Sequence, residues 1–317
     1  MESGGSESGD RPGTSNWATT KPIHVWESIG SVTVGKNFNG IFEGNGHTIS
    51  GLYLSSGNIG LGLFGFTGAG SSIQNLKLAN SYFCGTSTGD VELGAIAGRG
   101  LGNVSNVYVS NDVYMDCHGY YCGGIVGRNP FGANKVYSKC WFAGNIDMQA
   151  TGRQGGGILG SIGIATLSMN ECLFTGTITT ANNTAGPQVG GLIGQVSAAV
   201  SLTDCLSGGK VTSTGSPYTY GSVFGYTEAV AISLTDVYEA DDDCPYVIGK
   251  NGDKGTKTGS IITRDRYSLL GYGGYYELGS VFDFTNTWIA VQGSVPQLKG
   301  WHSNYEIRLP NDEVGLG

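Results

Sequence analysis

The fold is decided by the stretch GGIVGRNPFGANKVYSKCWFAGNI, residues 123–146. Its opening motif, in which glycines bracket a short apolar run, occurs along the chain as GLFG, GAIAG, GGIVG, GGILG, GGLIG and GSVFG. The intervals between the final glycines are 33, 29, 33, 34 and 31 residues, and these glycines are Gly65, Gly98, Gly127, Gly160, Gly194 and Gly225. A fixed period of this size is typical of solenoids and propellers.

The second half of the quoted stretch also repeats. Its CWFAGNI segment, residues 140–146, is matched by CLFTGTI at 172–178 and CLSGGKV at 205–211. Each segment has a cysteine, a glycine four residues later and then an apolar residue, and no part of the repeat has the 3.6-residue period of a helix. Three short strands in about 30 residues predict one coil of an all-β parallel β-helix, since a propeller blade needs about 40–50 residues.

The repeated residues have a physical role in such a coil. We expect the glycines at corners, where the chain needs either positive φ or a close backbone approach. The apolar residues between them are expected to point inward and stack on the same position of the next coil. Cys140, Cys172 and Cys205 share one such position, and we interpret them as a buried stack of free thiols rather than as disulfides or metal ligands.

The composition agrees with this architecture and excludes several classes of function. The chain has 317 residues with 56 glycines, only 13% charged residues and a net charge of −8 at pH 7. An acidic chain lacks the basic surface expected of a nucleic-acid binder, and no stretch approaches the roughly 20 apolar residues of a membrane span. With four histidines and no CxxC pair, we expect neither a metal site nor a cofactor.

The repeats divide the chain into four sections. We expect a flexible tether at 1–16, an N-terminal cap and first coil at 17–60, the repeats at 61–240, and a loop with C-terminal capping coils at 241–317. Caps are expected because open coil ends would expose strand edges. The polar Gly/Ser-rich start is similar to the tail of a matured lipoprotein with its signal removed. We therefore expect a monomer that is secreted or at the cell surface, either free or lipoprotein-anchored.

The repeats resemble the GLUG-motif family of bacterial surface and adhesin-like β-helix proteins. GGIVG with CWFAGNI and GGILG with CLFTGTI match best, whereas Val107 and Val237 stand where the other repeats have cysteine. FNGIFEGNGHTISGLYL at 38–54 and FDFTNTWIAVQGSVPQLKGW at 282–301 resemble the family's entry and exit segments. The resemblance covers roughly residues 25–301 and implies a right-handed parallel β-helix on a secreted or cell-surface protein. It implies no catalytic residues.

Two arginines suggest a surface for acidic glycans. Arg99 and Arg128 each follow the last glycine of a motif, so coils in register would stack them in one column. An arginine pair can hold a carboxylate or sulfate through paired hydrogen bonds. The alternative is a surface column paired with nearby carboxylates. If the coils are in register, the column continues as Ser161, Gln195 and Tyr226.

Aromatic residues crowd the same coils. Aromatic faces stack on sugar rings, and their polar groups can hydrogen-bond sugar hydroxyls. Alternatively these side chains are ordinary strand aromatics. Together with the arginines, the residues that we expect in a glycan-binding patch are Tyr108, Tyr114, Tyr120, Tyr121 and Trp141.

An enzyme on the same fold would need converging acidic groups. Asp112, Asp116 and His118 are the candidates, because glycoside hydrolysis uses two carboxyl groups about 5–10 Å apart. The alternative is that they are solvated turn residues. An acidic loop, Asp241–Asp243 with Asp253, similarly suggests either calcium binding or a solvated loop.

The sequence therefore predicts a non-catalytic extracellular adhesin or glycan-binding module of a bacterial surface protein. Its expected partner is an extracellular polysaccharide or a host glycan or glycoprotein. A glycoside hydrolase or polysaccharide lyase on the same β-helix is the alternative. A purely structural spacer is a third class, and it predicts no aromatic groove.

Overall fold

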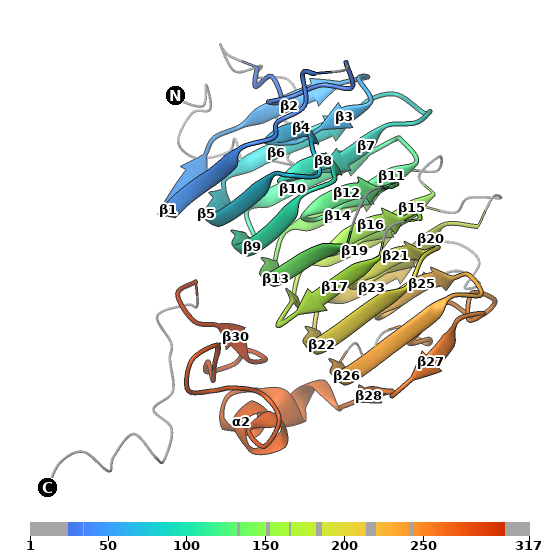
Figure 1. Cartoon of the computed structure of the whole chain (residues 1–317). Coiled ribbons are helices and arrows are strands. Elements are labelled where there is room, and N and C mark those ends of the chain that lie inside the picture. Colours follow the sequence, from blue (N-terminus) through green and yellow to red (C-terminus); the bar gives the residue numbers. More distant parts are fainter. Residues whose placement is uncertain are drawn as a thin grey trace, which may run out of the picture.

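The protein is a parallel β-helix of about six turns with about 32 residues in each turn (Figure 1). This computed structural model describes residues 25–33, 35–131, 134–149, 153–164, 166–181, 186–213, 220–240 and 244–301. The predicted all-β solenoid is confirmed. The expected tether at 1–16 and the acidic residues Asp241–Asp243 lie outside the described residues.

Four parallel sheets run along the stack, and each coil contributes strands to all four. Sheet 1 contains β1 (Ile41–Ser50), β5 (Ser72–Ala79), β9 (Asn103–Val109), β13 (Lys135–Phe142), β17 (Leu167–Asn170), β18 (Leu173–Phe174), β22 (Val200–Ser207), β26 (Ala231–Glu239), β27 (Thr256–Thr258) and β28 (Ile261–Thr263). Sheet 2 contains β2 (Tyr53–Ser56), β6 (Ser81–Gly85), β10 (Val113–Cys117), β14 (Asn145–Met148), β19 (Thr177–Thr180) and β23 (Lys210–Ser213).

The other two sheets are built from the glycine motif. Sheet 3 contains β3 (Gly60–Leu61), β7 (Glu92–Gly94), β11 (Tyr121–Gly123), β15 (Gln154–Gly156), β20 (Gln188–Gly190) and β24 (Tyr220–Gly221). Sheet 4 contains β4 (Phe64–Thr67), β8 (Ala97–Gly100), β12 (Val126–Asn129), β16 (Leu159–Ile162), β21 (Ile193–Val196) and β25 (Phe224–Thr227). Each motif therefore contributes to two strands, one in sheet 3 and one in sheet 4. A full coil has four strands, so the expected number of three strands per coil was wrong.

The glycines of the motif are required by close backbone approach. A Cβ atom on Gly127 would lie 2.7 Å from the carbonyl oxygens of both Gly98 and Leu93. Sheets 3 and 4 thus pack backbone against backbone at this corner. None of the six final glycines has positive φ. The positive-φ residues that recur from coil to coil lie along sheet 1 instead, at Asn75, Asn106, Lys139, Glu171, Asp204 and Asp236.

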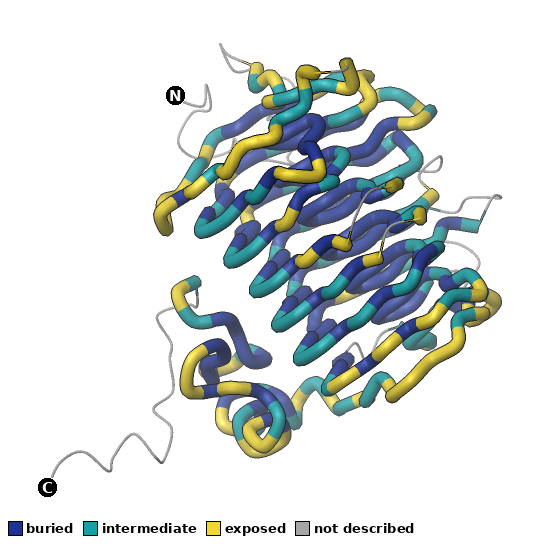
Figure 2. The backbone as a smooth tube through the Cα atoms, viewed as in Figure 1, coloured by how far each residue is buried: buried dark blue, intermediate teal, exposed yellow. Residues whose placement is uncertain are grey.

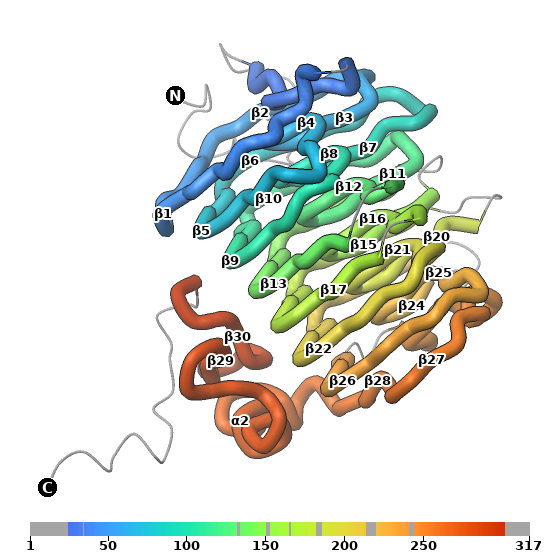
Figure 3. The backbone as a smooth tube through the Cα atoms, in the orientation of Figure 1, coloured from blue at the N-terminus to red at the C-terminus, as the bar shows by residue number. Residues whose placement is uncertain are grey.

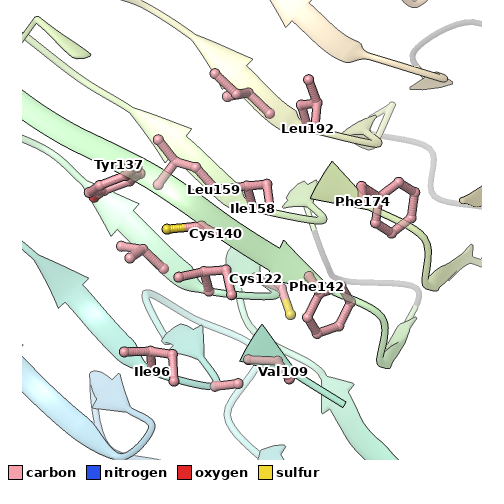
Figure 4. Close-up of a cluster of buried hydrophobic side chains, with 14 of the residues drawn as sticks. Ile96, Val109, Cys122, Tyr137, Cys140, Phe142, Ile158, Leu159, Phe174 and Leu192 are labelled. Carbon is pink, nitrogen blue, oxygen red and sulfur yellow. The ribbon is translucent and has the colours of Figure 1, made fainter. Parts of the chain in front are cut away.

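The interior is a continuous apolar core. The three repeat cysteines are fully buried free thiols, and Cys172 lies between Cys140 and Cys205, which confirms the predicted stack. Burial raises the pKa of the Cys172 thiol. Figure 4 shows Cys140 among its neighbours, and the stacked rings of Phe142 and Phe174 have centroids 6.3 Å apart.

The two ends of the stack expose strands. Figure 2 shows β1 and β27 with exposed stretches, while the coils between them are buried along their inner faces. At the N-terminal end, Ile29 and Phe38 form isolated bridges to Phe64 and Thr67 of β4. At the other end, Ile248 and Asp253 form bridges to β25, and β27 and β28 complete a last partial coil.

The segment after this coil packs against the side of the stack. We call residues 264–301 the strap; it contains η1 (Arg266–Leu269), α2 (Tyr272–Leu278), β29 (Trp288–Ile289) and β30 (Gln297–Leu298). It lies along the outer face of sheet 1, and Figure 3 shows it in orange and red beside the later coils. Neither described helix has the length that a membrane span requires.

An apolar column on sheet 1 explains this placement. Its residues are neighbours in register, in the order Tyr108, Trp141, Leu173, Leu206, Tyr238 and Ile262. The strap covers this column with Phe282, Trp288 and Leu298 and forms a second core. Apolar side chains that point outward along several coils need such a cover, because burial removes their surface from water.

Candidate functional site

The predicted glycan-binding residues are distributed over all four sheets. Tyr108 and Trp141 lie on sheet 1, and Tyr114 lies on sheet 2. Tyr121 lies on sheet 3 directly after Tyr120. Arg99 and Arg128 lie on sheet 4. The single patch that we expected therefore separates into smaller groups: Tyr108 stacks on Trp141, Tyr121 lies against Arg128, and Tyr114 lies on sheet 2.

The two arginines form the predicted column. Arg128 is the register partner of Arg99, and the column continues through Ser161, Gln195 and Tyr226. Fully buried Glu92 accepts hydrogen bonds from Nε and Nη2 of Arg99, both at 2.6 Å. Its Oε1 also accepts one from Nη1 of Arg128 at 3.2 Å. The arginines are thus paired with a carboxylate, which is the second of the two interpretations given above.

Aromatic rings cover the remaining faces of these guanidinium groups. The guanidinium carbon of Arg128 lies 4.1 Å from the ring centroid of Tyr121, and that of Arg153 lies 4.2 Å from the ring centroid of Tyr120. Arg99 lies 4.7 Å above the ring of Phe66. Both Arg99 and Arg128 therefore contact the shared Glu92 and an aromatic ring.

A cleft of about 450 Å³ lies where the end of the strap meets sheet 1. It contains two of the predicted residues, Tyr108 and Trp141, whose rings stack with centroids 4.3 Å apart. Trp301, from the end of the strap, lies 6.3 Å from Tyr108 between centroids. The other residues that line the cleft are Lys77, Ser110, Asn111, Ala143, Thr175, Arg266, Ser294, Val295 and Gln297.

Hydrogen bonds fix the walls of this cleft. Nε1 of Trp301 donates to Oδ1 of Asn106 at 2.8 Å, which ties the strap to a residue 195 positions earlier. Nε1 of Trp141 donates to Oγ1 of Thr175 at 2.7 Å. Nη1 of Arg266 donates to the carbonyl oxygen of Gly208 at 2.6 Å. Trp301, Trp141 and Arg266 are therefore held in place before any ligand arrives.

The cleft combines apolar, polar and cationic groups. The ammonium of Lys77 lies 5.2 Å from the ring centroid of Tyr108. Burial is the main cause that raises the pKa of Tyr108, so its hydroxyl stays protonated at neutral pH. Such a site can stack on a ring, bond hydroxyl groups and attract a negative charge.

A larger hollow, about 690 Å³, lies at the N-terminal end of the stack. Trp26, Gly60 and Phe66 are among its lining residues. None of the predicted site residues lines it. We therefore base the candidate site on the cleft under the strap.

The candidate catalytic residues lie in or beside β10 of sheet 2 and line neither hollow. Oδ1 of Asp116 and Nε2 of His118 are 3.5 Å apart. Asp112 lies in the exposed turn before β10, and the extended part of the chain from Val113 to Asp116 alone spans about 10 Å between Cα atoms. The nearer carboxylate is Asp147, the register partner of Asp116 on the next coil.

Asp116 and Asp147 interact through a shared amide. Nε2 of Gln149 donates to Oδ1 of Asp116 at 2.8 Å and to Oδ2 of Asp147 at 3.3 Å. Burial, followed by the charge of Asp116, raises the pKa of Asp147. Asp147 could not be identified from the sequence, because only the register of the coils places it beside Asp116.

A column of acidic residues crosses sheet 1 beside the strap. It consists of Glu171, Asp204 and Asp236, which occupy equivalent positions in three successive coils. Burial, followed by the charges of Asp236, Glu171 and Asp283, raises the pKa of Asp204 from 3.8 to about 6. The charged form of Asp204 is therefore disfavoured in the folded protein.

This raised pKa predicts a pH dependence of stability. Between about pH 4 and pH 6 the folded state binds more protons at Asp204 than the unfolded state, so stability falls as the pH rises through that window. We expect Asp204→Asn to raise the melting temperature at pH 7.5 and to flatten the stability profile between pH 4 and 6.5. Exposed Asp90, replaced by asparagine, is the control. An unchanged or lower melting temperature for Asp204→Asn at pH 7.5 would contradict the prediction.

Comparisons with known proteins support the fold. No family model matches the chain, so the GLUG resemblance stays a prediction. Over 121 residues, 37% of the chain, the sequence is 33% identical to halomucin of Haloquadratum walsbyi, and the match spans about 1% of that protein. The crystal structure of "a putative immunoglobulin A1 protease from Bacteroides ovatus" is similar with a TM-score of 0.62, over 88% of this chain and 83% of that one, at 18% identity. This chain therefore shares a β-helix with a protein of very different sequence.

Proposed function

We propose that this chain is a non-catalytic glycan-binding module of an extracellular or cell-surface bacterial protein, and that the cleft under the strap is the binding site. The observation that carries the proposal is the meeting of Tyr108, Trp141 and Trp301 with two cationic side chains in one hollow. Three aromatic residues from segments far apart in the sequence form one wall.

The chemistry of the cleft suits a sugar. A pyranose ring presents an apolar face to an aromatic ring and hydroxyl groups around its rim. Trp301 is half-buried and can offer a face, while Asn111 and Ser294 can hydrogen-bond hydroxyl groups. The volume falls in the range of small-molecule sites, about 300–1,000 Å³.

The two cations favour an acidic sugar. Lys77 and Arg266 both line the cleft; Lys77 belongs to sheet 1 and Arg266 to the strap. Both side chains are only half-buried. A uronate or sulfated residue would bring the negative charge that such a site attracts. The stacked coils would present this cleft on a stiff rod, as an adhesin requires.

The proposal predicts which variants lose binding. A glycan array with the full chain selects an oligosaccharide, and calorimetric titration then measures its affinity. Trp301→Ala should reduce that affinity by about tenfold or more, because the loss of one anchoring aromatic residue costs about 1.4 kcal/mol or more. Lys77→Gln should weaken acidic oligosaccharides more than neutral ones.

The Arg99→Ala, Arg128→Ala double variant is the matched control. Its residues lie on sheet 4 and contribute nothing to the cleft, so its affinity should equal that of the wild type when its fold is intact. Loss of binding in this variant with retained binding in Trp301→Ala would move the site to the arginine corner. An array without any hit would refute the proposal.

The alternative is a polysaccharide-active enzyme, and one observation favours it. Asp116 and Asp147 are adjacent carboxylates beside His118, and the pKa of Asp147 is raised, as an acid–base pair would need. Release of reducing sugar or of unsaturated uronate by the wild-type chain, abolished in Asp147→Asn, would establish this function. Binding without release supports the non-catalytic proposal.

A further inference from the structure

A second cluster lies on sheet 2, away from the cleft. Cys84 of β6 and Asp116 of β10 are register partners on successive coils. His118 follows two residues after Asp116, and alternate residues of an extended chain point to the same face. The register and the alternation therefore place a thiol, a carboxylate and an imidazole on one face of the stack.

The ligand atoms of these three residues converge. The Sγ of Cys84, a carboxylate oxygen of Asp116 and a ring nitrogen of His118 all lie within 4.8 Å of one another. Around a tetrahedral zinc ion, with bonds of about 2.0–2.3 Å, neighbouring ligand atoms are about 3.5 Å apart. The Asp116 oxygen and the His118 nitrogen already have this separation, 3.5 Å.

We propose that Cys84, Asp116 and His118 bind a divalent transition metal of the zinc class, with a fourth position open to solvent. One sulfur, one nitrogen and one oxygen ligand form a set that zinc accepts and that the hard cations calcium and magnesium do not prefer. A thiolate and a carboxylate also balance the charge of a divalent ion.

The surroundings hold these ligands in position. Oδ1 of Asp116 accepts a hydrogen bond from Nε2 of Gln149 at 2.8 Å, and its Oδ2 lies 3.5 Å from the hydroxyl of Tyr82. The backbone N–H of His118 donates to the carbonyl oxygen of Gly85 at 3.1 Å. Such outer contacts orient metal ligands and raise affinity.

Burial differs across the cluster in a way that suits a surface metal site. Cys84 is 6% exposed, whereas the side chains of Asp116 and His118 are 29% and 37% exposed. The sulfur would therefore bind at the base of the site, and the other two ligands at its more exposed rim. Asp147, the next residue across the ladder from Asp116, adds negative charge nearby. A bound ion would cross-link two coils.

No metal site was expected from the sequence, because the three ligands do not all lie close together along the chain. Asp116 and His118 are close in sequence, but Cys84 is 32 positions before Asp116, which no short metal-binding motif contains. The pairing of β6 with β10 alone brings the sulfur to the other two ligands.

Cobalt provides a spectroscopic test on the full chain. The reduced protein is treated with a chelator, exchanged into metal-free buffer and titrated with Co²⁺. We expect one equivalent to bind, with a thiolate-to-cobalt charge-transfer band that Zn²⁺ then removes. Zn²⁺ should also raise the melting temperature, because it binds only the folded state.

Matched variants assign the ligands. Cys84→Ser and His118→Gln should each weaken Zn²⁺ binding by at least about tenfold and remove the charge-transfer band. Cys244→Ser and His47→Gln lie elsewhere in the chain and should titrate as the wild type. If Cys84→Ser fails to fold, Asp116→Asn and His118→Gln decide the matter. Cobalt binding without the band, or unchanged affinity in these variants, would overturn the proposal.

Discussion

Gly127→Ala is expected to destabilise the β-helix by about 1–3 kcal/mol. The added methyl group would meet the carbonyl oxygens of Gly98 and Leu93 at 2.7 Å and the carbonyl carbon of Leu93 at 2.8 Å. All three atoms belong to backbone in the preceding coil, where paired strands leave little freedom to move. The free energy of unfolding in urea, followed by circular dichroism, measures the effect.

Gly70 provides the control. A Cβ atom there would meet nothing within 4 Å, and its φ is not positive. Gly70→Ala should therefore change the free energy of unfolding by less than about 0.5 kcal/mol. Equal stability of the two variants would show that sheets 3 and 4 do not pack through their backbones.

Trp288→Ala is expected to release the strap from sheet 1. Trp288 is fully buried and stacks on Phe282 with centroids 4.5 Å apart, and Phe282 in turn packs edge-on against Tyr238 of the apolar column. Truncation of a buried tryptophan costs about 3–5 kcal/mol. Because the strap is a local unit, we expect it to open while the coils stay folded.

Hydrogen exchange distinguishes local opening from global unfolding. In Trp288→Ala the amides of residues 266–298 should lose protection, and those of β13 and β22 should keep it. Tyr276→Ala, at a side chain 70% exposed on α2, is the control and should leave the protection unchanged. Full protection of the strap in Trp288→Ala would contradict its role as the anchor.

The periodic part of the fold could be predicted from the sequence because each coil repeats the same packing problem. The spacing of Cys140, Cys172 and Cys205 predicted their stack. The spacing of Arg99 and Arg128 predicted that they are register partners on adjacent coils. The strap could not be placed in this way. Its residues have no period, and the column that it covers consists of single residues from six strands.

The candidate site was predictable only in part, for a related reason. Tyr108 and Trp141 were identified from composition, but their partner Trp301 is 160 residues after Trp141 in a segment that we expected to close the stack. Glu92 gave no signal, since an isolated glutamate near a glycine motif is usually exposed. Its burial between Arg99 and Arg128 depends on the fold of the corner.

The fold alone does not distinguish a binding module from an enzyme. β-Helices host several functions, so the function has to be argued from the site. Here the aromatic cleft and the Asp116–Asp147 pair lie on different sheets, which makes the two functions separable by variants. The metal cluster shares Asp116 with the second site only, so a failure of metal binding would leave the glycan proposal intact.

The location of a bound sugar tests the central claim most directly. A crystal structure with an oligosaccharide selected on the array should show a sugar ring in the cleft, against Trp301 and within reach of Lys77. A sugar bound at the Arg99–Arg128 corner, along sheet 2 or in the N-terminal hollow, with an empty cleft, would contradict the account.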